Sequence, residues 1–133
     1  PHLLQRAQNL TIFMLRALSG EAPLIYGDGG QTRDFVYVKD VVQANLLAAA
    51  HEAAPGRVFN VGTSNSVSIN GLWQMIAQLA QCQLPAKHEA PRPGDIVHSL
   101  ASIQRVKEVM GFQPAISFEE GLRQTFTWYR QSV

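Results

Sequence analysis

The feature that most constrains the fold is an alternation of helical apolar stripes with apolar runs too short to be helices. Apolar residues recur at steps of three and four, the period of a helix with one buried face, in residues 3–18, 69–79 and 118–129. Short apolar runs at residues 24–26 and 58–62 lie between these stripes and predict strands, of which 58–62 is typical of a buried parallel strand. The polar residues 87–89 are strand-like as well. Helices alternating with short strands predict an α/β fold, built as one domain over residues 1–133.

Polar residues and glycines at the ends of the apolar segments predict where the helices begin and end. Asp40 and Gln43 have the spacing of a capping box, so Asp40 is expected to cap a helix whose buried face carries Val41, Ala44 and Leu47. That helix is apolar on its other sides too, which is typical of burial on more than one face. Other expected boundaries are serine caps at Ser68, Ser102 and Ser117, the last in a capping box with Glu120, and a left-handed stop at Gly111.

The glycine-rich stretch at residues 27–30 predicts a turn rather than a dinucleotide-binding loop. A dinucleotide fingerprint follows a strand and opens a helix, because the helix N-terminus binds the pyrophosphate. Here the turn is followed by residues 34–38, whose β-branched and aromatic side chains favour a strand. The sequence therefore offers no segment for binding NAD.

Two turns place an arginine beside an aspartate, namely Arg33 with Asp34 and Arg92 with Asp95. The planar guanidinium suits phosphate oxygens, and a carboxylate accepts hydrogen bonds from a ribose hydroxyl. Two such turns facing one cleft would hold a nucleoside diphosphate. From the residues alone, Arg33 could equally pair with Asp34 or Asp40 on the surface, and Arg92 with Asp95 within a proline-rich loop.

Composition excludes several classes of protein. The formal net charge is +1 and no run of lysine or arginine occurs, so nucleic acid is not an expected partner. The apolar runs are too short to cross a bilayer, which argues against a membrane protein. Cys82 is the only cysteine, which excludes an intrachain disulfide and agrees with a reducing compartment, so a cytoplasmic location is expected.

The remaining chemically active side chains are expected to be structural. His2, His51 and His88 lack the spacing of metal ligands, so no metal site is predicted, and His98 has no nucleophile beside it. The aromatic residues of the helical stripes are expected to pack in the core. These are Trp73, Trp128 and Tyr129.

Taken in order, several motifs resemble the carboxyl-terminal part of NAD-dependent nucleotide-sugar epimerases and dehydratases, which are extended short-chain dehydrogenases/reductases. The motifs lie at residues 25–29, 32–38, 40–42, 59–62, 68–70, 92–99, 111–114, 120–122 and 128–129. They cover the chain from about Ile12 to its end, and the match looks closest to UDP-sugar 4-epimerases. The resemblance implies that the fold is a small substrate-domain remnant with helices and short strands.

The same resemblance assigns roles to four residues. Arg33 and Arg92 would contact the diphosphate of a UDP-sugar, and Asp95 would accept a hydrogen bond from the uridine ribose. Asn60 would lie on the strand that leads toward the substrate cleft. The chain departs from the family at Val97, where a basic residue is frequent.

In this family an amino-terminal Rossmann half binds NAD and carries a catalytic Tyr-x-x-x-Lys pair, and this sequence contains neither. The resemblance therefore implies a fragment, inactive alone, that binds a UDP-sugar weakly and has no cofactor of its own. The alternative is a non-catalytic remnant that associates with itself and binds no nucleotide sugar. The identity of the sugar cannot be predicted, because the residues around the reacting carbon belong mostly to the absent half.

Self-association is expected under either hypothesis. In the family the helix that follows residue 40 and the strand at 58–61 pack against the Rossmann half, so this chain would expose their apolar faces. Large exposed apolar patches are uncommon on soluble monomers. We therefore expect a homodimer or a larger assembly, with Val41, Leu46, Leu47 and the stripe at 3–18 at the interface.

Overall fold

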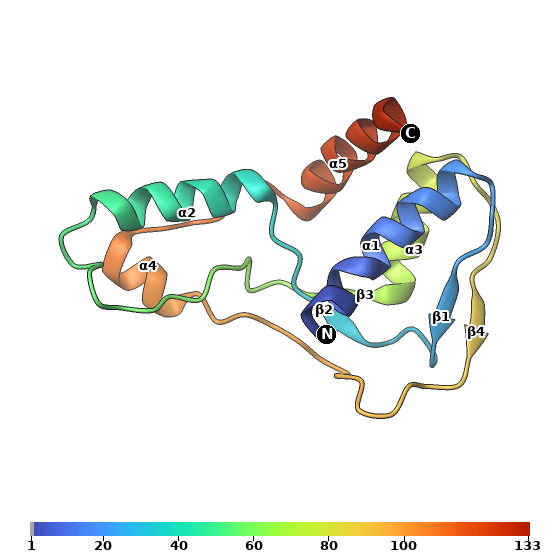
Figure 1. Ribbon diagram of the computed structural model, residues 1–133, viewed down its shortest axis with the longest axis horizontal. Coiled ribbons are helices and arrows are strands. Elements are labelled where there is room, and N and C mark those ends of the chain that lie inside the picture. Colours follow the sequence, from blue (N-terminus) through green and yellow to red (C-terminus); the bar gives the residue numbers. More distant parts are fainter. Residues whose placement is uncertain (1) are drawn as a thin grey trace. The chain divides into compact units, whose positions relative to one another are not determined.

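The computed structural model describes the backbone of residues 2–133 and the side chains from residue 9 onward (Figure 1). The predicted side-chain positions of Leu3, Leu4 and Ala7 lie outside these described residues. The elements in chain order are α1 (His2–Leu18), β1 (Leu24–Tyr26), β2 (Thr32–Arg33), α2 (Val38–Ala50), β3 (Val67–Ser68), α3 (Ile69–Leu79), β4 (Lys87–Glu89), α4 (Gln104–Met110) and α5 (Phe118–Ser132).

These elements belong to two compact units, each of which is described by itself. Unit 1 comprises the residues up to Gln31 together with Ser68–Val97 and Leu122–Val133. Unit 2 comprises Thr32–Val67 and His98–Gly121. The expectation of one domain over the whole chain stays a prediction.

Unit 1 is built on β1 and β4, which pair in parallel with Leu24 opposite Lys87 (Figure 1). Its core contains Phe13 of α1 and Trp73 of α3, whose rings meet edge to face with centroids 5.8 Å apart. The Trp73 indole Nε1 donates to the Leu84 carbonyl at 3.0 Å, so the polar atom of this buried ring is satisfied. Both strands and the helices α1 and α3 confirm the sequence prediction.

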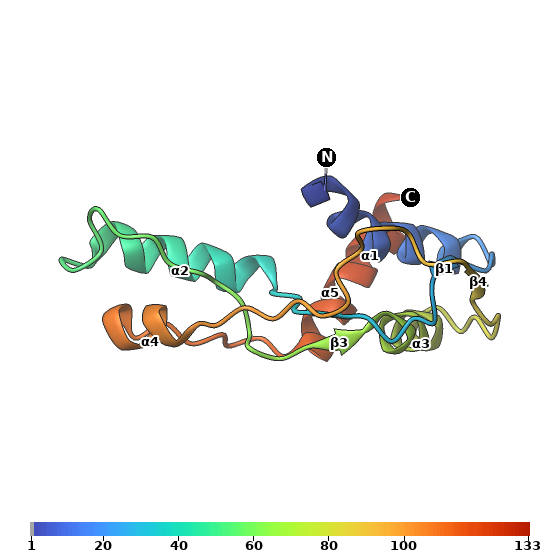
Figure 2. The same cartoon turned by 90° about the horizontal axis from the view of Figure 1, so that it is seen from below.

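Unit 2 packs α2 and α4 around an apolar cluster. Figure 2 shows the two helices running beside each other within this unit. The buried members of the cluster are Ala44, Ala54, Ile103, Val106, Met110 and Phe112. Phe59 and Val61 pack against the cluster, whereas Val58 is 81% exposed.

The strand predicted at residues 58–62 is wrong. These residues have no strand assignment, and the backbone of 58–61 makes no hydrogen bond within the described part of the chain. The alternation of exposed and packed side chains along them is the period expected of an extended chain. A strand needs a neighbour with which to share a hydrogen-bond ladder, and apolar sequence alone does not supply one.

The strand predicted at residues 34–38 is also wrong. Regular pairing stops at Arg33, the last residue of β2, and α2 begins at Val38. The β-branched and aromatic side chains of this segment instead lead directly into a helix. Tertiary contacts of Asp34 and Phe35 override the local preference for a strand.

The helix boundaries follow the prediction at three positions. The Ser68 hydroxyl accepts a hydrogen bond from the Gly71 backbone N–H at 3.0 Å, which caps α3. The Ser117 hydroxyl accepts from the Glu120 N–H at 3.2 Å at the start of α5. Gly111 ends α4 with a φ of +68°, a left-handed conformation that costs glycine little.

Two predicted caps are wrong. Residue 37, not Asp40, is the N-cap of α2, and its side chain makes no capping hydrogen bond. The N-cap of α4 is Ile103 rather than Ser102, again without a side-chain bond. Asp40 lies in the first turn of α2, and its side chain instead binds backbone groups far along the chain. Its carboxylate accepts from the Ala115 and Ile116 backbone N–H groups at 3.0 and 3.1 Å.

The prediction that Trp128 packs in the core is wrong as well. This side chain is 61% exposed, and its ring makes an edge-to-face contact with the Tyr129 ring, with centroids 5.1 Å apart. On α5 it is Leu122 and Phe126 that are buried, as predicted, and the Tyr129 hydroxyl lies 3.0 Å from the Thr11 hydroxyl. Trp128 belongs to the outward side of the helix.

Candidate functional site

The candidate site in unit 1 lies where β1 and β4 end together. Because the strands are parallel, the turn after Tyr26 and the loop after Glu89 leave from the same edge of the sheet. Ligand sites of parallel sheets lie outside the carboxyl ends of the strands. The two segments are joined there, since the Gly27 N–H donates to the Glu89 carbonyl at 2.8 Å and the His88 Nδ1 lies 2.8 Å from the Gly27 carbonyl.

Hydrogen bonds hold the turn at residues 27–30, and the backbone conformation of Gly29 favours glycine. Gly29 has a φ of +77°, and a Cβ built on it would lie 2.0 Å from the Asn70 Oδ1. The Asn70 Nδ2 donates to the Asp28 carbonyl at 2.8 Å, and the Gly30 N–H donates to the Asp28 Oδ1 at 2.8 Å. As predicted, this is a turn. It leads into β2 rather than into a helix, so it does not fit the pyrophosphate of NAD.

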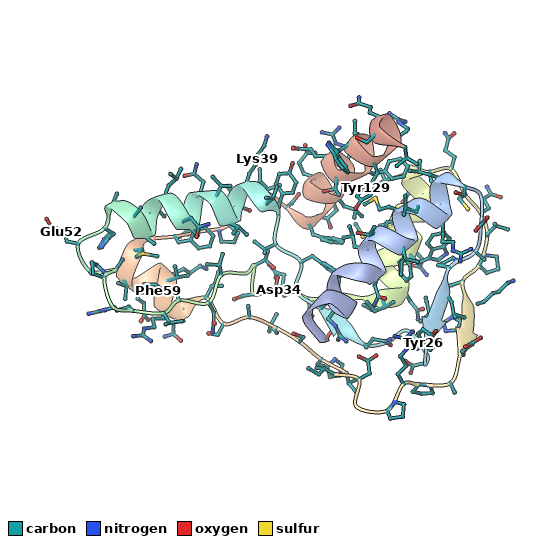
Figure 3. The ribbon with its side chains drawn as sticks, viewed as in Figure 1. Tyr26, Asp34, Lys39, Glu52, Phe59 and Tyr129 are labelled. Atoms are coloured by element: carbon teal, nitrogen blue, oxygen red, sulfur yellow. The ribbon has the colours of Figure 1, made fainter. Side chains whose placement is uncertain are left out.

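Arg92 is an exposed residue among those predicted to bind the ligand. Its guanidinium carbon lies 3.7 Å from the centroid of the Tyr26 ring (the tyrosine is labelled in Figure 3). The side chain is exposed, and its N–H donors make no hydrogen bond within the described part of the chain. A guanidinium donates in its own plane, so stacking on a ring leaves its donors open to an anion.

Asp95 is on the same turn as Arg92 and is exposed. Its backbone N–H donates to the Arg92 carbonyl at 3.3 Å, and Gly94 between them has a φ of +77°. The turn therefore brings together the two residues that the sequence assigned to the diphosphate and the ribose.

The other two predicted residues are in unit 2, in contrasting surroundings. Arg33 is only 9% exposed, and its Nη1 donates to the Thr32 carbonyl at 2.7 Å. The alternative that Arg33 forms a surface ion pair is therefore wrong, because the side chain is not on the surface. Asn60 is exposed on the unpaired segment 58–61, where its side chain makes no hydrogen bond within the described residues.

His98 has the structural role that the sequence favoured. Its Nδ1 lies 3.0 Å from the Thr32 hydroxyl, and the two residues form an isolated parallel bridge. The Ser99 N–H donates to the Thr32 carbonyl at 3.1 Å and extends this pairing. The histidine thus ties the segment after residue 97 to β2 within unit 2.

The sequence did not predict the role of Asp34. Its carboxylate accepts from the Thr63 N–H at 3.0 and 3.1 Å, from the Thr63 hydroxyl, and from the Ser64 N–H at 3.0 Å (Figure 3 labels Asp34). Ser64 has a φ of +57°, an uncommon conformation for a residue other than glycine. Gly62 approaches the same carboxylate so closely that a Cβ would lie 2.8 Å from the Asp34 Oδ2.

Neither a metal site nor a membrane span is found in the described residues. No three histidine, cysteine or acidic side chains among them are grouped so that they could hold a metal ion. No helix in this part of the chain is both long and apolar enough to span a bilayer.

Comparison with known proteins identifies what the chain is similar to. Residues 3–62 match the model of the NAD dependent epimerase/dehydratase family. The UDP-glucose 4-epimerase of Mycolicibacterium smegmatis is 36% identical over 121 residues, which are 91% of this chain and 38% of that protein. The chain thus spans about two fifths of the length of the curated relatives it matches.

Two solved structures are similar in fold. The crystal structure of UDP-glucose 4-epimerase with UDP-glucose from Thermotoga maritima has a TM-score of 0.87 and 38% identity, covering 92% of this chain and 39% of that one. The UDP-glucose 4-epimerase of Thermus thermophilus in complex with NAD has a TM-score of 0.77 and 30% identity, covering 94% and 40%. The predicted resemblance and the predicted fold class are both confirmed.

Proposed function

We propose that this chain, a relative of the NAD-dependent epimerase/dehydratase family, is the UDP-sugar-binding portion of a nucleotide-sugar epimerase. The observation that carries the proposal is the fold match, since nine tenths of the chain superimposes on part of an epimerase solved with UDP-glucose. The accessible Arg92 supports it independently, because an exposed guanidinium with open donors is suited to a diphosphate.

In this proposal Arg92 donates to the diphosphate and Asp95 accepts from the ribose. Arg33 and Asn60 are the proposed contacts from unit 2. Arg33 is buried, so its proposed role is to present a positive charge from a fixed position. Arg92 and Asp95 are instead on an exposed turn that a ligand can reach. Of the four, Arg92 is therefore the sharpest test.

Catalysis by this chain alone is not proposed. Epimerisation in this family needs hydride transfer to a bound nicotinamide and a basic tyrosine in a Tyr-x-x-x-Lys pair. The residues four positions after Tyr26, Tyr37 and Tyr129 are Gly30, Val41 and Val133, so none of the three tyrosines has that lysine. We expect the purified chain to show no NAD-dependent turnover of a UDP-sugar, and measurable turnover would contradict this.

The test of binding is a UDP titration by calorimetry with two arginine variants. Losing a charge-assisted contact costs about 1.5–3 kcal/mol, so Arg92→Ala should weaken UDP binding by about ten-fold or more. Arg130→Ala is the matched control, because Arg130 is an exposed arginine on α5. Unchanged affinity in Arg92→Ala, or equal losses in both variants, would refute the assignment.

A second candidate function, a self-associating module, is favoured by one exposed surface of unit 2. Val38, Val42 and Leu46 follow one another at four-residue steps along α2 and are 63%, 48% and 58% exposed. Leu47, by contrast, packs on the apolar cluster of the same unit. The unpaired segment 58–61 adds backbone donors and acceptors that a strand of a second copy could use.

Light scattering at micromolar concentration tests this second function. We expect a mass of at least twice the 14.7 kDa of one chain, and a shift toward one chain in Val42→Glu. Gln43→Glu adds the same charge one residue along the helix and should leave the mass unchanged. A clean monomer in the unaltered chain would refute self-association.

The single half-exposed Cys82 supports a reducing compartment, and the cytoplasm is our proposed location.

A further inference from the structure

We propose that Tyr26 is a positioning residue that holds the Arg92 guanidinium for a diphosphate by stacking beneath it. The inference deepens the proposed function and rests on it. It starts from the 3.7 Å separation between the guanidinium carbon and the ring centroid, well within the roughly 6 Å that defines a cation–π contact.

The ring of Tyr26 is a firm support because its backbone is fixed on both sides. Tyr26 pairs with Glu89 in the parallel sheet, and the next residue donates its N–H to the Glu89 carbonyl at 2.8 Å. The Tyr26 carbonyl accepts from the Gln31 Nε2 at 2.9 Å. The aromatic ring therefore starts from a strand end that cannot shift without breaking these bonds.

The loop that carries Arg92 is held against the same strand end. The Pro91 ring lies close to Gly27, where an added Cβ would be 3.6 Å from its Cγ. Proline also fixes its own φ, and a second proline at position 93 restricts the backbone of Arg92 itself. The arginine is thus flanked by two stiff residues and placed over the ring.

Stacking on an aromatic ring holds the guanidinium of an arginine and leaves its N–H donors available to an anion. A carboxylate partner would occupy the in-plane donors and neutralise the charge, whereas an aromatic face contacts only the flat side. The guanidinium donors of Arg92 make no hydrogen bond within the described chain. An arginine held in this way loses less side-chain freedom when it binds, which favours affinity.

The test compares Tyr26→Leu with Tyr26→Phe, and Trp128→Leu serves as a control that removes an exposed aromatic ring from the same unit. We expect Tyr26→Leu to weaken UDP binding by about two- to five-fold, the effect of an exposed cation–π contact. Tyr26→Phe keeps the ring and should restore the unaltered affinity, and so should Trp128→Leu. Equal affinity in Tyr26→Leu and the unaltered chain would overturn the proposal.

A second measurement needs no ligand and separates this inference from the proposed function. The side-chain protons of an arginine stacked on a ring resonate upfield, so the NMR signals of the Arg92 δ protons should be shifted in the unaltered chain and in Tyr26→Phe. In Tyr26→Leu they should return to ordinary values. Ordinary values in the unaltered chain would overturn the stacking itself. Failure of UDP to bind an unaltered chain that shows the shift would instead refute the proposed function and leave the stacking of Arg92 on Tyr26 supported.

Discussion

Replacing Asp40 by alanine should destabilise unit 2 strongly, because this carboxylate joins two segments far apart in sequence. Asp40 is 2% exposed, and its two oxygens accept the backbone N–H groups of residues 115 and 116 at 3.0 and 3.1 Å. A hydrogen bond to a charged group contributes about 1.5–3 kcal/mol. Ala115 is itself exposed, so its N–H can turn to water and the two losses will not add in full. We expect a loss of about 2–4 kcal/mol, a large part of a typical domain's stability.

The assay is urea unfolding followed by far-UV circular dichroism, because both tryptophans belong to unit 1 and would not report on α2 and α4. Asp40→Asn keeps one acceptor and should lose roughly half as much as Asp40→Ala. Glu52→Ala removes the same charge from an exposed position just after α2 and should change the free energy of unfolding by less than about 0.5 kcal/mol. A loss in Asp40→Ala as small as that of Glu52→Ala would refute the reasoning.

Two further predictions test the turns around the candidate residues. Gly29→Ala should destabilise the chain by about 2 kcal/mol more than Gly20→Ala. Both glycines have positive φ, but only a Cβ at Gly29 meets the Asn70 side chain, at 2.0 Å. Thermal melts followed by the fluorescence of the tryptophans would show it, and equal melting temperatures would count against a tight contact at this turn. Asp34→Ala should loosen the loop at residues 62–64, because it removes the carboxylate that binds the loop backbone. Limited proteolysis should then cleave this loop faster in Asp34→Ala than in the control Asp28→Ala, which loses a hydrogen bond in another turn. Equal cleavage rates in the two variants would mean that Asp34 does not hold the loop.

Local chemistry explains what the sequence predicted correctly. Ser68 caps α3 and Gly111 ends α4 because each role depends on the residue itself and its near neighbours. The parallel strands Leu24–Tyr26 and Lys87–Glu89 were also recognisable, since each is a short run bounded by turn residues. These features needed no knowledge of the rest of the fold.

The roles of the two aspartates could not be predicted in the same way. Asp40 has the spacing of a capping box, but its partners are 75 and 76 residues further along the chain. Asp34 binds backbone groups 29 and 30 residues away, and only the folded chain brings them near. Sequence spacing describes neighbours along a helix or a turn, so it misses a carboxylate that is used to join distant segments.

Arg33 and Arg92 show why site residues need the structure even when the sequence identifies them. Each stands near an aspartate in a glycine-containing stretch, and a common motif gave them a common role. Arg33 is buried with its Nη1 on a backbone carbonyl, so binding a ligand there requires little reorganisation but offers little access. Arg92 is exposed on an aromatic ring with its donors open, so it can meet an incoming anion first. If Arg92 contacts a diphosphate, added salt should weaken that binding, because solvent and its ions screen the charge of an exposed side chain.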